Sequence, residues 1–234
     1  MARVVGIGHQ DFETVRRKNN FYIDKTEFIK EWWESDDAVT LITRPRRFGK
    51  TLNMSMLEKF FSMEYAQRAE LFEGLRIWKY KEYREIQGTY PVIFLSFANV
   101  KENTYEQARE SICRIIQELY NKNIFLLHTD LLTDNEKEEY KQISTKMNDS
   151  MISDAIRKMS DYLSRYYGKK TIILLDEYDT PIQEAYVGGF WPDLMGVLRS
   201  LLNSTFKTNP YLERAIMTGI TRVSKESIFS DLNN

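Results

Sequence analysis

The stretch that decides the fold is Val39-Thr40-Leu41-Ile42-Thr43-Arg44-Pro45-Arg46-Arg47-Phe48-Gly49-Lys50-Thr51. Its first five residues are mostly β-branched or aliphatic, which predicts a buried strand over Val39–Thr43. A short basic loop follows. From Thr51 to Phe61 the apolar residues recur at helical spacing. The stretch therefore predicts a strand, a tight loop and a helix in immediate succession.

A Gly-Lys-Thr sequence at this place has a chemical meaning. The loop turns backbone N–H groups inward and the helix adds its positive end, so the position suits phosphate oxygens. Gly49 lets the backbone approach the phosphates, Lys50 is placed to bridge the β- and γ-phosphates, and the Thr51 hydroxyl is a ligand for Mg²⁺. The expected nucleotide-binding residues are Arg46, Arg47, Phe48, Gly49, Lys50 and Thr51.

The loop departs from the usual pattern G-x-x-x-x-G-K-[ST] in two ways. Arg44 stands where the first glycine belongs, and Pro45 lacks a backbone donor. A bare Gly-Lys-Thr is also compatible with an ordinary loop before a helix. In that case Arg46 and Arg47 would be plain surface charges. A second motif has to decide between these interpretations.

That second motif is Ile172-Ile173-Leu174-Leu175-Asp176-Glu177, an apolar strand that ends in two acids. Open α/β sheets bind ligands at the carboxyl ends of their strands, so this pair would meet the loop there. We expect Asp176 to hold the magnesium shell and Glu177 to polarise the attacking water. Alone, Asp-Glu would equally be a cap for the next segment. Together with the strand, Gly-Lys-Thr and helix, it indicates nucleotide binding.

A third apolar strand, Arg214–Thr218, ends in a small polar residue. In ATPases with a catalytic Glu, a polar side chain on the strand beside the acidic strand senses the γ-phosphate. Thr218 is the candidate for this role, and Arg222 is a candidate for reaching the phosphates. The alternative is a strand that simply ends in a turn.

The rest of the chain completes an α/β pattern. A further strand is predicted over Pro91–Phe97, with helices over Thr104–Tyr120, around Ile152–Leu163 and from Pro192 onward. Strands that alternate with helices predict a mainly parallel sheet flanked by helices. Residues 123 to 150 are more polar and contain a predicted helix after Thr133, which indicates an insertion on the sheet scaffold.

The composition limits the classes of protein to which the chain can belong. The chain has 234 residues with 42% hydrophobic residues, which fits one globular domain. A formal net charge of −1 predicts no general attraction to nucleic acid or to an anionic membrane. The one cysteine, Cys113, falls in an apolar helical pattern and is predicted to be a core residue. No signal peptide or membrane span is recognisable, so we expect a cytoplasmic protein.

Several long strings resemble the bacterial AAA-ATPase-like family over nearly the whole chain. They are Phe21–Thr26, Arg44–Thr51, Leu175–Pro181, Met217–Arg222 and Ser227–Asn234. Arg-Pro-Arg-Arg-Phe-Gly-Lys is the family's own form of the phosphate loop. The resemblance implies a P-loop NTPase with Walker A and Walker B motifs, and ATP and Mg²⁺ as ligands. It also implies an ASCE-type strand order 5-1-4-3-2, of which we expect the final strand to be missing.

Family members are usually longer, with a helical region and a PD-(D/E)XK nuclease-like domain after the ATPase domain. We expect residues 1–234 to be the P-loop domain alone. The leading hypothesis is an ATPase that switches or drives an attached effector. The alternative is a regulatory module that binds ATP without hydrolysing it. Nucleic acid would be reached only through the absent nuclease-like domain, and a homo-oligomer is possible.

Three further segments leave alternatives open. Asp24-Lys25-Thr26 either flanks the adenine, braces the loop or caps the helix that follows. Asp179 either joins the acidic cluster or caps the helix after Pro181. Trp32 and Trp33 are either core residues or a platform for a base, and core packing is favoured.

Overall fold

The computed structural model describes residues 5, 6 and 8–221. In this part of the chain four strands form a parallel sheet in the order β1-β4-β3-β2. The strands are β1 (Val39–Thr43), β2 (Val92–Ser96), β3 (Thr171–Asp176) and β4 (Leu212–Gly219). The predicted α/β class with a parallel sheet flanked by helices is confirmed, and each predicted strand is present within two residues of its expected bounds. The expected burial of Val39–Thr43 is wrong, because all five residues of β1 are only partly buried at an edge of the described sheet.

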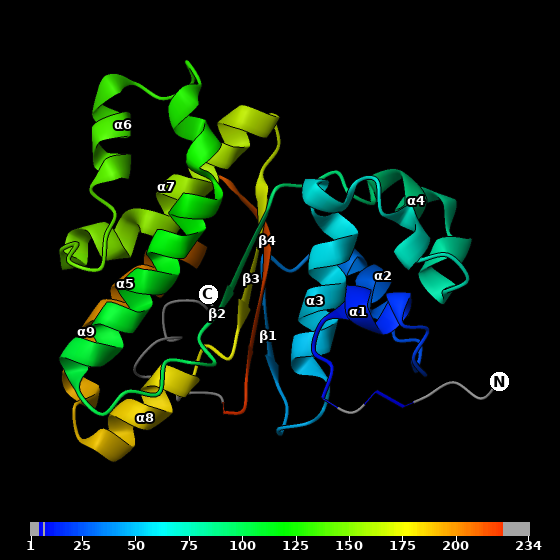
Figure 1. The fold of residues 1–234 in the computed structure, drawn as a ribbon, viewed down its shortest axis with the longest axis horizontal. Coiled ribbons are helices and arrows are strands. Elements are labelled where there is room, and N and C mark those ends of the chain that lie inside the picture. The colour runs from blue at the N-terminus through cyan, green and yellow to red at the C-terminus, as the bar shows by residue number, and fades with distance from the viewer. Residues whose placement is uncertain (1–4, 7, 222–234) are drawn as a thin grey trace.

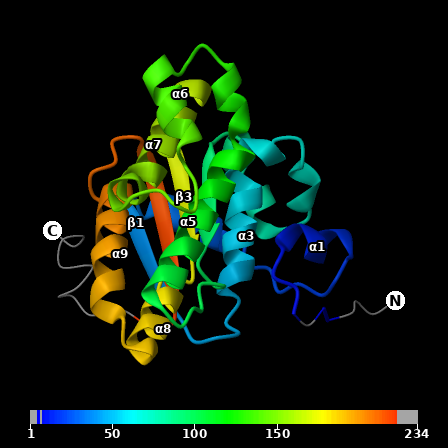
Figure 2. The same cartoon turned by 60° about the vertical axis from the view of Figure 1, so that its left-hand side comes forward.

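Helices cover both faces of the sheet (Figures 1 and 2). One face carries α1 (Phe12–Arg17), α2 (Glu27–Glu34), α3 (Lys50–Phe61) and α4 (Lys81–Ile86) with the 3-10 turns Met63–Tyr65, Ala69–Leu71 and Arg76–Lys79. The other face carries α5 (Tyr105–Lys122), α7 (Asp149–Tyr167) and α9 (Trp191–Phe206). The helix α8 (Thr180–Gly188) lies at the end of the sheet. The turn Ile124–His128 and α6 (Asp134–Lys141) lie on the outer side of α5 and α7.

The central strand β3 explains why its sequence shows no alternation. Ile172 and Leu174 pack into the core with α3, whereas Ile173 and Leu175 pack into the core with α5, α7 and α9. All six residues of the strand are buried. A strand covered on both faces needs an apolar side chain at every position, so a continuous apolar run is the expected signature.

Local sequence signals place the helix ends. The Thr104 side chain accepts a bond from the backbone of Gln107 at the start of α5, and Thr133 forms a reciprocal capping box with Glu136 at the start of α6. Gly168 ends α7 with a φ of 65°. The helix expected from Thr104 and the helix expected after Thr133 are thus present, each with a side-chain cap at its first turn.

The segment from 123 to 150 belongs to the larger core despite its polarity. Leu126, Leu132, Tyr140 and Met147 are buried together with residues of α5 and α7. Cys113 is buried there too, and burial raises the pKa of its thiol. Over the described residues no helix is both long and apolar enough to cross a membrane.

Candidate functional site

The predicted site residues follow the carboxyl ends of three adjacent strands. In the register of β1 and β4, Ile42 lies opposite Thr218, and in that of β3 and β4, Leu175 lies opposite Met217. The next position of β3 is Asp176, which bonds the Thr218 hydroxyl. The loop before α3 and the turn before α8 therefore lie at the same end of the sheet, the lower end in Figure 1.

The loop from Arg44 to Gly49 is open to solvent and folds around one lysine. Residues 44 to 48 are exposed, whereas Lys50 is only 8% exposed. The Lys50 ammonium donates to the carbonyl oxygens of Arg44 at 2.8 Å and Pro45 at 3.1 Å. Lys50 thus reaches back into its own loop from the first turn of α3, where Thr51 is its partly buried neighbour.

Backbone conformation in this loop depends on positive φ angles. Gly49 precedes α3 with a φ of 78°, and none of the described residues lies within 4 Å of the Cβ that another residue would carry. Glycine is therefore favoured by conformation and not by space. Arg47 also has a positive φ, 67°, which is uncommon for a residue with a side chain. The Arg44 backbone N–H donates to the Gly219 carbonyl at 3.1 Å and fixes the loop's start to β4.

The acidic end of β3 is buried. Asp176 is 1% exposed; its Oδ1 accepts from the Thr218 hydroxyl, and its Oδ2 has no protein partner among the described residues. Glu177 is half-buried and has a φ of 51°. Its carboxylate accepts from the Thr180 hydroxyl at 3.2 Å. Strained non-glycine residues of this kind gather at functional sites, where surrounding contacts hold them.

Asp179 has a role that neither sequence interpretation named. Its Oδ2 accepts from the Gln183 side chain at 2.7 Å, from the backbone N–H groups of Ile220 at 2.9 Å and Thr221 at 2.8 Å, and from the Thr221 hydroxyl. It makes no side-chain cap to α8, so the capping interpretation is wrong. The buried carboxylate instead ties the turn after β3 to the turn after β4.

Gly219 makes this tie possible, because a Cβ there would lie 2.6 Å from the Asp179 Oδ1 and 2.7 Å from the Tyr178 ring. The Tyr178 hydroxyl also donates to the Thr221 carbonyl at 2.9 Å. In the sequence, a glycine directly after Thr218 is the one sign of such close packing. Arg222 and Ser227–Asn234 lie outside the described residues.

The segment before α2 is a brace. Asp24 accepts from the Thr26 N–H and hydroxyl and, with its other oxygen, from the Arg76 N–H at 2.8 Å. The Thr26 hydroxyl accepts from the Ile77 N–H at 3.2 Å and forms no side-chain cap to α2. The expectation of a side-chain cap by Thr26 is therefore wrong. The segment joins the start of α2 to the turn Arg76–Lys79.

The tryptophans are core residues, as favoured by the sequence. Trp32 is 3% exposed, and Trp33 stacks on Phe61 with ring centroids 5.2 Å apart. The Arg214 guanidinium lies over the Trp33 ring at 4.6 Å. A platform for a nucleotide base is therefore not formed by this pair.

Comparison with known proteins places the chain in a family. It is 28% identical over 236 residues to an uncharacterised protein encoded in the vnfD 5′ region of Azotobacter chroococcum mcd 1; the match covers 97% of this chain and 39% of that protein. The chain thus spans about two fifths of the length of the curated relative it matches. No solved structure matches. The model of the AAA-ATPase-like family, described as predicted AAA-ATPase, matches residues 6–229, and the chain belongs to this family.

Proposed function

We propose that this chain is a P-loop NTPase domain that binds ATP with Mg²⁺ in the loop Arg44–Thr51 and hydrolyses it. The observation that carries the proposal is the adjacency of β1, β4 and β3. It brings Lys50, Thr218 and the pair Asp176-Glu177 to one end of the sheet. Family membership supports an ATP-related function.

The phosphate-binding part rests on the loop and the helix behind it. A helix of 12 residues begins at Lys50, and its first backbone N–H groups and dipole favour an anion. The two carbonyl contacts of the Lys50 ammonium are weak substitutes for charged oxygens. We expect β- and γ-phosphate oxygens to take their place, with Arg46, Arg47 and Phe48 forming the outer side of the loop.

The residues fit a magnesium ion bound together with the phosphates. No cluster of three or more His, Cys, Asp or Glu residues is present within the described ranges, so these protein groups form no separate metal cage. The buried Asp176 Oδ2 has no partner there, and Thr51 lies in the first turn of α3. The Asp176 Oδ2 and the Thr51 hydroxyl oxygen suit the few protein ligands that Mg²⁺ takes beside phosphates and water. When bound, the ion would neutralise developing charge on the phosphates.

Glu177 is our candidate for polarising the attacking water. The turn after β3 holds its backbone in a left-handed conformation, and Thr180 orients its carboxylate. Thr218 already bonds both the Asp176 carboxylate and the Glu177 N–H, so it is placed to report on the γ-phosphate. We retain Arg222 as a candidate for a phosphate contact.

Hydrolysis would switch or drive an effector attached to this domain. A nuclease-like domain is the effector that the family resemblance favours, and any nucleic-acid contact would occur through it. Assembly into a homo-oligomer and a cytoplasmic location complete the proposal.

A second candidate is a regulatory module that holds ATP without turnover. Pro45 in the loop favours it, because proline has no backbone N–H to offer a phosphate, and the Arg44 N–H already donates to the Gly219 carbonyl. Glu177 favours hydrolysis, because binding alone does not need this acid.

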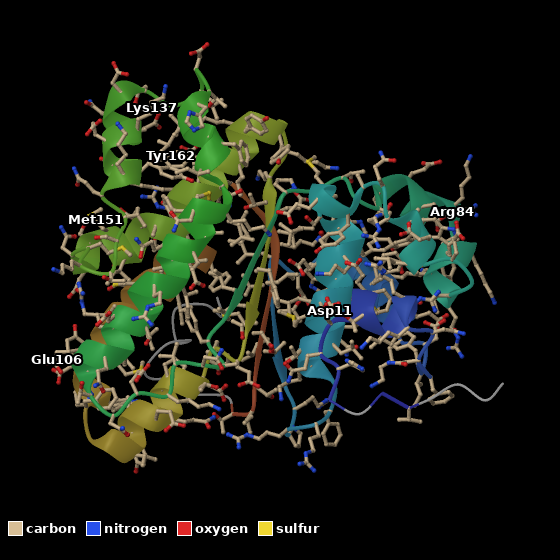
Figure 3. All side chains as sticks on the ribbon, viewed as in Figure 1. Asp11, Arg84, Glu106, Lys137, Met151 and Tyr162 are labelled. Atoms are coloured by element: carbon tan, nitrogen blue, oxygen red, sulfur yellow. The ribbon has the colours of Figure 1, made fainter. Side chains whose placement is uncertain are left out.

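The test is ATP–Mg²⁺ binding and turnover by wild type, Lys50→Ala and Glu177→Gln. We expect Lys50→Ala to weaken binding at least about 100-fold, or about 2.7 kcal/mol, and Glu177→Gln to bind normally without turnover. Lys137→Ala and Glu138→Gln on α6 are matched controls remote from the site, as Figure 3 shows for Lys137. Equal binding by wild type and Lys50→Ala would refute the proposal. Binding without turnover in wild type would favour the regulatory module.

A further inference from the structure

A cavity of about 450 Å³ lies beside the phosphate loop and is unexplained by the phosphate site. Its walls come from the N-terminal segment and from the loop and first turns of α3. Gly49 and Arg47 form one side, and Leu52 and Asn53 of α3 continue it. Its volume is within the range of small-molecule sites, which is about 300–1,000 Å³. A ligand whose phosphates lie on the loop would have its remaining part at this cavity.

The polar feature of the cavity is an unused donor. Asn20 lines it, and the Asn20 Nδ2 is buried without a hydrogen-bond partner among the described residues. A buried amide donor without a partner is unfavourable by about 1–3 kcal/mol, so such groups normally have one. A ligand acceptor in the cavity would satisfy it.

Gly6 allows Asn20 to stand in this place. A Cβ on Gly6 would lie 2.4 Å from the Asn20 Nδ2 and 2.5 Å from the His9 Cδ2. These separations are too short for any real contact. A side chain at position 6 would therefore displace the amide or fill the space next to it.

The mouth of the cavity is apolar and exposed. Phe21 is 52% exposed, Ile23 is 67% exposed and Val5 is 65% exposed, and all three line the cavity. Tyr22 forms a fixed wall between Phe21 and Ile23, because its hydroxyl contacts the Met56 sulfur at 3.3 Å. A flat apolar ring held here would cover surface that water otherwise contacts.

We propose that this cavity binds the purine base of the nucleotide and that the Asn20 carboxamide selects adenine over guanine. The proposal rests on the proposed function, because the loop must hold the phosphates. A carboxamide offers one donor and one acceptor side by side. Adenine presents the complementary pair, the N7 acceptor and the N6 amino donor, whereas guanine presents two acceptors, N7 and O6.

The experiment measures the binding of three magnesium complexes by titration calorimetry. They are ATP, GTP and inorganic tripolyphosphate, which carries the phosphates without a base. The proteins are wild type, Asn20→Ala, Gly6→Ala and the control Asn121→Ala, whose side chain is exposed on α5. Thermal unfolding of each free protein checks that it folds. Because the Asn20 donor has no partner in the described part of the chain, its removal should leave the free protein as stable as wild type.

We expect wild type to prefer ATP to GTP. Asn20→Ala should weaken ATP binding about fivefold to a hundredfold, the range of two hydrogen bonds, and should reduce the preference over GTP. Gly6→Ala should weaken ATP binding as well. All variants should bind tripolyphosphate as wild type does. ATP affinity and base preference unchanged in both cavity variants would overturn the base site. Failure of wild type to bind either ATP or tripolyphosphate would instead refute the phosphate site.

Discussion

The loop after β1 and the turn after β3 lie at the same end of the sheet but are held in opposite ways. Residues 44 to 48 are exposed, and Lys50 bonds to carbonyls of its own loop. After β3, Asp176 and Asp179 are buried and bonded to the end of β4. Side-chain bonds to β4 hold the turn after β3, although the Asp176 Oδ2 has no partner among the described residues, whereas the loop offers its lysine only two backbone carbonyls. Under the proposed function, this contrast supports chemistry at the preorganised turn after β3 and capture of phosphate at the loop.

The largest effect on stability should come from a substitution in the buried turn after β3. Asp179→Ala leaves the backbone donors of Ile220 and Thr221 and the side chain of Gln183 without their acceptor. We expect a loss of about 2–4 kcal/mol in the free energy of unfolding. Urea denaturation measures it, with Asp130→Ala at an exposed position as the control. Equal midpoints for Asp179→Ala and wild type would show that the tie between the two turns contributes nothing to stability.

The same glycine-to-alanine substitution should lower stability by different amounts at the end of β4 and in the loop before α3. Gly219→Ala places a Cβ against Asp179 and Tyr178, and we expect a loss of about 1–3 kcal/mol through steric shift. Gly49→Ala has free space around it and opposes only the positive φ, so about 1 kcal/mol is expected.

Gly196→Ala is the matched control for both, because Gly196 lies in α9 and no described residue lies within 4 Å of the position of its missing Cβ. There alanine should stabilise by about 0.5–1 kcal/mol. Thermal or urea unfolding of the three variants gives the order of their changes in stability directly. A larger loss of stability for Gly49→Ala than for Gly219→Ala would show that the loop after β1, and not the contact between the turn after β3 and the end of β4, is the more tightly packed.

The smallest effect is a pH dependence at Asp24, in the segment before α2 that bonds to Arg76. Burial alone would raise the pKa of Asp24, but the bonds from Thr26 and Arg76 together hold this pKa below its usual value. The resulting stability is fully present above the unfolded pKa, about 3.9, and is lost as the pH falls through the lower folded pKa.

Asp24→Asn should therefore unfold more easily than wild type at pH 7, by about 1 kcal/mol, and the difference should shrink toward pH 3. Asp37→Asn, at an exposed position nearby, should show no such trend. A difference that stays constant between pH 7 and pH 3 would contradict the role of the charge.

The fold was predictable because its signals are local. The run Thr171–Leu175 and the helix ends at Thr104, Thr133 and Gly168 each depend on a few neighbouring residues. The site residues Lys50, Asp176, Glu177 and Thr218 were predictable as candidates, because their motifs are fixed in sequence and parallel strands bring such ends together. Their roles in binding and turnover stay predictions.

Other features were not predictable, because they depend on partners distant in sequence. Asp179 bonds to Ile220 and Thr221 only after β3 and β4 pair, and a carboxylate before a helix more commonly caps it. Asp24 finds Arg76 through tertiary packing. The cavity beside Asn20 depends on how the N-terminal segment lies against α3. Its only sequence sign was the apolar Phe21-Tyr22-Ile23 before a polar segment.

The position of β4 between β1 and β3 also bears on how the chain reaches this fold. β1 pairs with β4 alone in the described sheet, and Val39 meets Ala215 only after most of the described chain has been synthesised. Closing so long a loop is slow, whereas β2 and β3 have a shorter separation to close. The strand before the loop Arg44–Gly49 is therefore synthesised before the other three strands and joins the sheet late, so its apolar residues wait longest for their partner strand.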